Sequence, residues 1–219
     1  MTDAPSMISA IVGGDHVLSL PVVDYSESTI GELRPLTVSS LNDDGLMESI
    51  TKWRNAASKS FLTQFEATPD RTRRWLQDVV LRDDSRLLFL LHSTTRIVGH
   101  YGFKNLTHES AEVDNLVRGE AGGHPQLIHF AEVALVKWLF STFGISRLYG
   151  YVFGGNWQAL DLHARVGFEN SDLIPLVRME TGGETRFEMG KSGLESPEGL
   201  YSQKITLSRD SFTARGFST

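Results

Sequence analysis

Cysteine is absent from the 219-residue sequence. This absence excludes disulfide bonds, thiolate nucleophiles and zinc sites built from cysteine. The seven histidines show no spacing typical of a metal site, so we expect no metal cofactor. The fold must depend on packing, and a composition that is 40% hydrophobic is sufficient for one substantial core.

Long apolar runs are absent as well. No stretch approaches the ~20 apolar residues that cross a bilayer, and the first residues lack the basic start and apolar centre of an export signal. The formal net charge of -6 argues against a broad nucleic-acid surface. We therefore expect a cytoplasmic protein that binds neither membranes nor nucleic acid.

Internal repeats and low-complexity linkers are missing too, which favours one domain with appendages. Stretches rich in Val and Leu at 17–26 and 31–38 predict short strands. Three further segments, separated by short polar turns, predict an antiparallel meander at 86–93, 96–103 and 111–119.

Two helices are predicted between these groups of strands. Residues 42–55 begin with side chains that favour helix caps. Residues 68–81 have Thr68 as N-cap and Pro69 at the first helical position.

A longer helix is predicted at 125–143, with Pro125 at its start and Gly144 as its stop. Its polar positions make a narrow stripe, so most of its circumference should be buried. A hairpin is predicted at 168–190, with a turn at 181–184.

A run of small residues links the meander to the long helix. It contains Gly119, Ala121, Gly122 and Gly123, and it precedes backbone N–H groups that have no partner within the helix. Small residues let a ligand approach these groups, and the positive end of the helix dipole favours an anion such as a pyrophosphate. The segment matches neither the GxxxxGK[ST] loop that binds nucleoside triphosphates nor the GxGxxG loop that binds dinucleotides, which argues against both of these ligands. A tight connection without a ligand is the alternative.

A second motif follows a predicted strand at 147–153. In NWQALDLHARVGF, Asn156 takes a capping position and the segment ends in Gly167 and Phe168. Together with the glycine-rich segment and the long helix, this order of elements resembles the GNAT acyl-CoA N-acetyltransferase superfamily over about residues 32–180.

The resemblance implies an α/β fold, with a central mixed and mostly antiparallel sheet flanked by helices. We expect an N-terminal β extension at 1–31, the GNAT domain at 32–190 and a C-terminal β extension at 191–219. The resemblance also implies acetyl-CoA as co-substrate, and direct attack of a primary amine on its thioester.

The pyrophosphate loop of the family corresponds to Arg118 through Gly123, with Ala121 where the family usually has glycine. Alanine restricts the backbone, so a register centred on 122–124 is an alternative. In the family, a backbone N–H of the preceding strand contacts the thioester carbonyl. The residues that the resemblance assigns to CoA are Leu116, Val117, Arg118, Gly119, Ala121, Gly122, Gly123, His124 and Asn156.

His163 stands where the family commonly has a tyrosine that protonates the departing thiolate. Histidine can donate a proton near neutral pH, so we expect it to take this role. The alternative is a histidine that packs on the inner face of its helix with one nitrogen bonded to backbone.

The acceptor amine must lose a proton before it attacks. Asp114 and Glu112 lie two residues apart, on one face of their strand, and Asp114 is the first candidate for the base. Asn115 is expected to orient the substrate with Asp114. Deprotonation through water, without a dedicated base, is the alternative.

The segment VDNLVRG resembles a GNAT subgroup that includes acetyltransferases acting on amino sugars attached to nucleotides. We therefore expect a small-molecule amine as substrate, namely an amino sugar, free or nucleotide-linked. Acetylation of a protein N-terminus, as in ribosomal-protein acetyltransferases, and a non-catalytic CoA-binding module are the alternatives. The hairpin and tail offer an edge for a homodimer.

Overall fold

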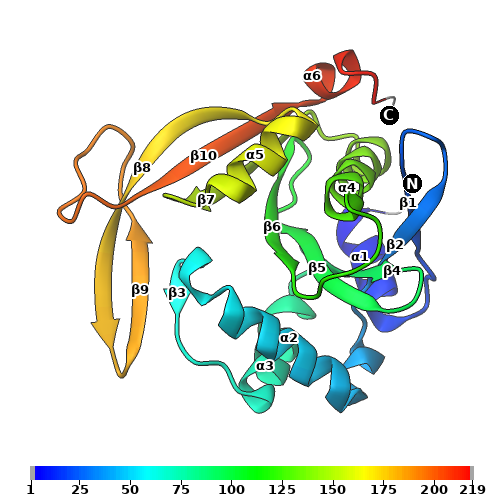
Figure 1. The fold of residues 1–219 in the computed structure, drawn as a ribbon, viewed down its shortest axis with the longest axis horizontal. Helices are drawn as coiled ribbons and strands as arrows, with labels where there is room; N and C mark the ends of the chain where they lie inside the picture. The colour runs from blue at the N-terminus through cyan, green and yellow to red at the C-terminus, as the bar shows by residue number, and fades with distance from the viewer. Residues whose placement is uncertain (1–2, 218–219) are drawn as a thin grey trace.

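The computed structural model describes residues 3–217 and contains one ten-stranded sheet with helices packed on both faces (Figure 1). The strand order is β1-β2-β4-β5-β6-β7-β10-β8-β9-β3. The strands are β1 (Leu20–Val23), β2 (Thr29–Pro35), β3 (Thr63–Gln64), β4 (Leu87–Ser93), β5 (Ile97–Lys104), β6 (Ser110–Arg118), β7 (Arg147–Phe153), β8 (Glu169–Thr181), β9 (Glu184–Met189) and β10 (Tyr201–Ser208). The α-helices are α1 (Ala4–Gly13), α2 (Asp44–Ala56), α3 (Pro69–Trp75), α4 (Leu127–Phe143), α5 (Trp157–Val166) and α6 (Arg209–Ala214), with short helical turns at Val38–Asn42, Ser58–Ser60 and Leu76–Val80.

Side chains alternate along β4 between two hydrophobic cores. Leu87, Phe89 and Leu91 pack in the larger core with α1, α4 and α6. Leu88 and Leu90 point to the other face, into a smaller core with α2 and the turn that follows α3. Because successive side chains of a strand face opposite ways, β4 carries apolar residues on both sides and forms the middle layer of the fold.

The sheet opens between β6 and β7. These strands are parallel and pair only from Ser110↔Arg147 to Glu112↔Tyr149 among the described residues. Beyond Glu112 the two strands separate, so residues 113–118 of β6 have no partner strand on that side. On the other edge of β7 lies β10, which pairs with both β7 and β8.

Most of the predicted elements are confirmed. The meander is β4, β5 and β6, Thr68 caps α3 through a bond from the Arg71 amide, and Gly144 ends α4 with φ of 66°. The predicted hairpin is β8 and β9, with Gly182 and Gly183 both at positive φ in its turn.

Two of the differences from the prediction concern the helices α4 and α1. The long helix begins at Leu127 and not at Pro125, because Pro125 and Gln126 form a turn in which the Leu127 amide donates to the His124 carbonyl. The second is α1, which precedes the predicted N-terminal strands; Asp3 caps it and Gly14 ends it with φ of 89°.

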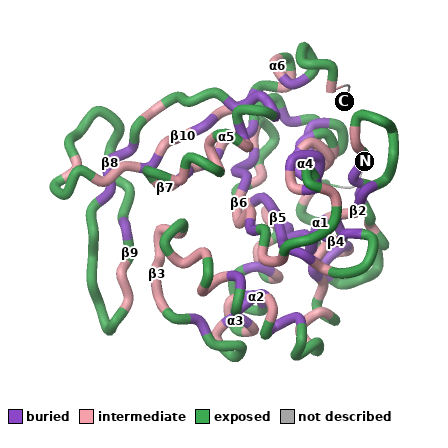
Figure 2. Tube along the Cα trace, in the orientation of Figure 1, coloured by how far each residue is buried: buried purple, intermediate pink, exposed green. Residues whose placement is uncertain are grey.

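Buried segments concentrate in β4, β5, β6 and α4, whereas the hairpin of β8 and β9 is mostly exposed (Figure 2). Within residues 3–217, none of the helices combines the length and the apolar character that crossing a bilayer requires.

Candidate active site

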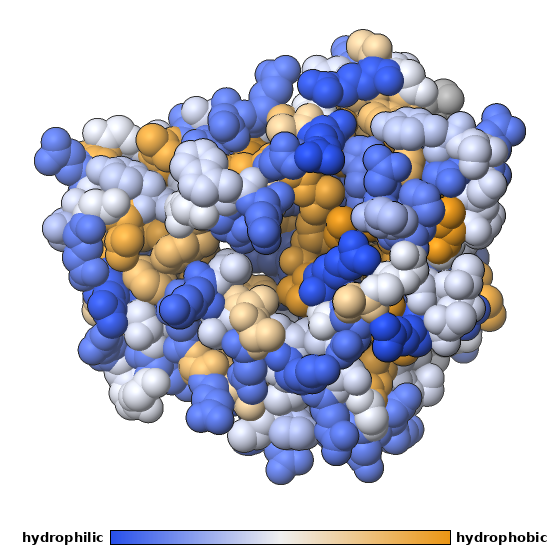
Figure 3. Space-filling model, viewed as in Figure 1, coloured by the Kyte–Doolittle hydropathy of each residue, from blue (hydrophilic) through white to orange (hydrophobic). Residues whose placement is uncertain are grey.

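A cleft of about 1570 Å³ enters the molecule where β6 and β7 separate. Its walls come from α2, α3 and β9 on one side and from β6, β7 and α5 on the other. The space-filling view shows this hollow near the centre of the face, with both hydrophobic and hydrophilic surface around it (Figure 3). Its volume exceeds that of an ordinary small-molecule pocket, so two substrates can be accommodated together.

His163 lines this cleft from α5 and is 6% exposed. Its Nδ1 lies 2.5 Å from Oε1 of Glu132, a fully buried residue of α4. The Tyr101 hydroxyl donates to the same oxygen at 2.9 Å. Burial, and then the charge of Glu132, raise the pKa of Tyr101 well above its ordinary value, so this hydroxyl keeps its proton and remains a donor.

The Glu132 carboxylate fixes the orientation of the histidine ring. A bond at Nδ1 selects the tautomer and leaves Nε2 as the nitrogen for other partners, and a carboxylate stabilises positive charge on the ring. The alternative of a backbone partner for His163 is not what the structure shows, since the partner is a side-chain carboxylate. The pair thus fixes a ring whose Nε2 is left for proton transfer in the cleft.

Asp114 and Glu112 lie on β6 and both contact Lys104 of β5. Lys104 Nζ is 3.2 Å from Glu112 Oε1 and 3.3 Å from Asp114 Oδ1. Burial alone would lower the pKa of Lys104, but the two carboxylates outweigh burial and raise it. Burial raises the pKa of Glu112 despite the charge of Lys104. All three side chains line the cleft, so the predicted acidic pair is present with a cation beside it.

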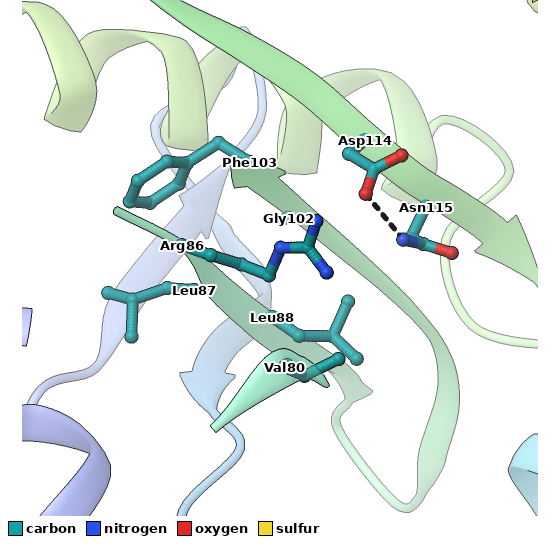
Figure 4. Close-up of a pocket in the computed structure, with 8 residues that line it drawn as sticks. All are labelled: Val80, Arg86, Leu87, Leu88, Gly102, Phe103, Asp114 and Asn115. Atoms are coloured by element: carbon teal, nitrogen blue, oxygen red, sulfur yellow. Dashed lines mark hydrogen bonds between the residues drawn. The ribbon is translucent and has the colours of Figure 1, made fainter. Parts of the chain in front are cut away.

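Asn115 donates to Oδ2 of Asp114 at 2.6 Å, and the two side chains lie next to each other (Figure 4). The narrow crevice beneath them, which Arg86 also lines, has no room for a water-sized molecule. A substrate must therefore reach Asp114 from the large cleft, which both residues also line.

A β-bulge shapes this part of β6. The register with β5 shifts between His100 and Gly102, and Asn115 takes φ of 55°. His100 is 2% exposed and its Nδ1 donates to the Asn115 carbonyl at 2.7 Å. Burial lowers the pKa of His100 to about 4, so the ring is neutral at physiological pH. His100 thus holds the bulge that places Asp114 and Asn115.

The glycine-rich loop follows β6 and offers backbone amides only in its second half. The amides of Gly119 and Glu120 both donate to the Val98 carbonyl, at 2.9 and 3.0 Å. Among residues 3–217, the amides from 121 to 124 have no acceptor, and this segment lies directly before α4. The free amides include all three on which the alternative register, 122–124, is centred.

Gly119 has a packing role. A Cβ atom at this position would lie 2.0 Å from Cγ of Trp53, so the indole ring occupies the space that a side chain would need. Trp53 also donates from Nε1 to Glu120 at 3.1 Å. The loop is therefore anchored to α2.

Two arginines support the other half of the loop. Arg96 donates to the Ala121 carbonyl, and Arg118 donates to the Gly122 carbonyl at 3.0 Å. Their charges lie beside free amides and next to the positive end of α4, an arrangement suited to a pyrophosphate. The residues present thus fit the anionic part of CoA.

The remaining predicted CoA residues divide between the cleft and its rim. Leu116, Val117, Arg118 and Asn156 line the cleft. Asn156 caps α5 through a bond from the Ala159 amide at 3.2 Å. The loop from 119 to 124 does not line the cleft itself, but it follows directly after Arg118, which does.

Glu132 and Tyr101 were not identified from the sequence. Glu132 lies in an otherwise apolar stretch of the long helix, and its position in the sequence assigns it to the narrow polar stripe of that helix. Its partner His163 is 31 residues away, and Tyr101 is 31 residues away in the other direction. A charged residue in an apolar helix was the available signal, because a buried carboxylate requires a partner.

Comparison with protein families shows that residues 32–169 match the family described as acetyltransferase (GNAT) domain. No curated protein matches the sequence. Among solved structures, spermidine N-acetyltransferase from Vibrio cholerae, in complex with CoA and spermine, has a TM-score of 0.60 and 14% identity, over 83% of this chain and 96% of that chain.

Two other solved structures have acceptors of different kinds. RimL, a ribosomal L7/L12 alpha-N-protein acetyltransferase in complex with coenzyme A, has a TM-score of 0.62 and 14% identity, over 89% of this chain and 99% of that chain. FdhC, a nucleotide-linked sugar GNAT, has a TM-score of 0.60 and 11% identity, over 85% and 90%. At these identities the likeness shows the fold and does not carry over an acceptor.

Proposed function

This chain belongs to the acetyltransferase (GNAT) domain family, and on that premise we propose that it transfers acetyl from acetyl-CoA to the primary amine of an amino sugar, free or nucleotide-linked. The observation that carries the proposal is the buried pair of His163 and Glu132 on the cleft that Asp114 also lines. A proton donor and a carboxylate in one cleft are the groups that acyl transfer to an amine needs.

Bound acetyl-CoA supplies a thioester that an amine attacks directly, so no enzyme nucleophile is required. The amides from 121 to 124, with Arg118 and Arg96, hold its pyrophosphate. The unpaired edge of β6 at Leu116 or Val117 offers an N–H to the carbonyl oxygen, on which charge develops. Asn156 borders the cleft at the start of α5.

Proton movements are assigned to two side chains. Asp114 accepts the proton of the substrate ammonium, and Asn115 orients the acceptor beside it. His163 holds a proton at Nε2 and donates it to the departing sulfur, while Glu132 stabilises the ring in its charged form. Glu112 is bonded to Asn105 and Lys104 and is the second candidate for the base.

The amino-sugar acceptor is supported by the likeness of the 113–119 segment to nucleotide-amino-sugar acetyltransferases. The fold is shared with FdhC and equally with enzymes that have other acceptors, so it does not choose among them. The other acceptor class is a protein N-terminus, as for RimL. A cytoplasmic location and a homodimer stay predictions.

The proposal is tested by measuring thiol release from acetyl-CoA with a panel of amines. The panel contains amino sugars, nucleotide-linked amino sugars, spermidine and an N-terminal peptide. We expect the highest kcat/KM with an amino-sugar compound. A preference for the peptide or for spermidine would show that the acceptor is that amine and not an amino sugar. No thiol release with any amine would support the non-catalytic alternative.

The role of His163 is tested in the same assay. We expect His163→Ala to lower kcat by about 10²- to 10⁴-fold, the usual range for a general acid, with little change in CoA affinity. If kcat of His163→Ala equalled that of wild type from pH 6 to 9, the assignment of His163 as proton donor would be refuted.

A further inference from the structure

Arg54 projects from the last turn of α2 into the wall of the cleft. One of its nitrogens, Nη2, donates to the Thr63 carbonyl. The other, Nη1, is buried and has no hydrogen-bond partner among residues 3–217. No carboxylate of the described residues lies within 4 Å of this guanidinium, in contrast to Arg73, which contacts Asp44 at 2.6 Å.

An unpaired and partly buried charge is unfavourable, because the protein does not replace the water that the charge loses. Burial, and then the nearby charge of Arg71, lower the pKa of Arg54 to about 10, which still leaves it protonated at neutral pH. The fold therefore maintains a positive charge here without neutralising it. Such a site is completed by an anion from outside the chain.

Aromatic rings hold the two guanidinium groups in place. The Cζ atom of Arg54 lies 3.6 Å from the ring centroid of Phe61, and Cζ of Arg71 lies 3.4 Å from that of Phe65. Arg71 also contacts Glu184 at 2.6 Å. Stacking orients the two planar groups at the wall of the cleft, where an anion in the cleft would meet their charge.

The cluster and the predicted pyrophosphate loop belong to different elements of the fold. Arg54 and Arg71 belong to α2 and α3, whereas the free amides lie at the start of α4. The acidic pair, Glu112 and Asp114, lines the same cleft from β6. One cleft thus offers carboxylates to an ammonium group and guanidinium groups to an anion.

From these contacts we infer that the acceptor carries an anionic group, a phosphate or a carboxylate, which binds Arg54 with Arg71 beside it. This inference rests on the proposed function, since it concerns the second substrate of the same site. It favours an acidic amine over a polyamine, because a polycation would be repelled by the unpaired charge of Arg54.

The test is calorimetry on protein saturated with CoA, so that the pyrophosphate loop is already filled. The probes are inorganic pyrophosphate and UDP for a phosphate, and glucuronate for a carboxylate. We expect at least one probe to bind, and its affinity to fall as salt is raised. Arg54→Gln should weaken that binding at least tenfold. The affinity of Arg54→Lys for the probe should lie between those of wild type and Arg54→Gln.

Arg82→Gln is the matched control. Arg82 is 70% exposed, contacts Asp78 four positions earlier and does not itself line the cleft, so its loss should leave probe binding unchanged. Thermal unfolding of each variant confirms that it is folded. Absence of binding by every probe, or equal binding by Arg54→Gln and wild type, would overturn the inference.

Thiol release separates this outcome from failure of the proposed function. With an acidic amine as acceptor, Arg54→Gln should raise the KM for the amine and leave the KM for acetyl-CoA unchanged. If neutral and acidic forms of one amino sugar were acetylated equally well, the proposed function would stand and the anion site would not. If no amine led to release, the proposed function itself would fail.

Discussion

Nδ1 of His163 lies 2.5 Å from Oε1 of Glu132, a carboxylate with no exposed surface. The two residues come from α5 and α4, and both helices meet beside the opening between β6 and β7. The tyrosine that the family commonly has at position 163 needs no such partner to donate a proton. The buried carboxylate thus supports the proposed role of His163 as proton donor.

Glu132→Gln should lower kcat about 10- to 100-fold, because a hydrogen bond to a charged group contributes about 1.5–3 kcal/mol. The amide keeps the shape but does not stabilise a charged ring. The KM for acetyl-CoA should change little, which steady-state kinetics will show. Glu48→Gln, on an exposed position of α2, is the control. A loss of kcat in Glu132→Gln that is accompanied by a comparable loss in the free energy of unfolding would indicate a structural role only.

Asp114→Asn should reduce kcat/KM for the amine by about 10²- to 10⁴-fold if the carboxylate is the base. Glu112→Gln should reduce it less, because Glu112 is buried and bonded to Asn105 and Lys104. The measurement is kcat/KM from pH 6 to 9. Unchanged turnover in Asp114→Asn would instead favour deprotonation through water.

His100 predicts a loss of stability in acid. The folded ring has a pKa of about 4, whereas the ordinary value is 6.5, so the unfolded chain binds the proton more readily between these values. The stabilising contribution of the neutral ring is complete above pH 6.5 and is lost as the pH falls toward 4. It amounts to about 3 kcal/mol in the free energy of unfolding.

Urea unfolding at several pH values measures this effect. His100→Gln should show a shallower decline between pH 6.5 and 4 than wild type. His108→Gln should decline as wild type does, since the His108 side chain is 90% exposed. Identical slopes for His100→Gln and wild type would exclude His100 as the cause.

Gly119→Ala should destabilise the fold by about 1–3 kcal/mol, because the added methyl would collide with the ring of Trp53. Gly45→Ala is the control; its Cβ would meet its nearest atom, Oδ1 of Asp43, at 3.4 Å near the start of α2. Differential scanning calorimetry of the two variants compares the positions. A melting temperature for Gly119→Ala equal to wild type would contradict the packing role.

Local signals predicted most of the fold. Capping by Thr68 and Asn156, and positive φ at Gly144 and Gly167, depend on neighbours within a few residues, so the sequence shows them directly. Asp3 and Gly14 are comparable signals for the helix α1. The prediction does not include this helix, because it begins with the strand at residue 17.

The site was less accessible to prediction. His163 was identified, but its pairing with Glu132 depends on how α4 and α5 pack, which no spacing encodes. Similarly, the glycines of the loop favour a ligand by their size, yet Gly119 is small because of Trp53, 66 positions earlier in the chain. Residue type indicated the chemistry, and tertiary contacts decided which groups are free.

A crystal structure with coenzyme A tests the central claim most directly. We expect the diphosphate oxygens to accept hydrogen bonds from amides within 121–124, and the sulfur to lie within reach of His163 Nε2. A diphosphate bound elsewhere on the molecule, or a sulfur remote from His163, would contradict the account.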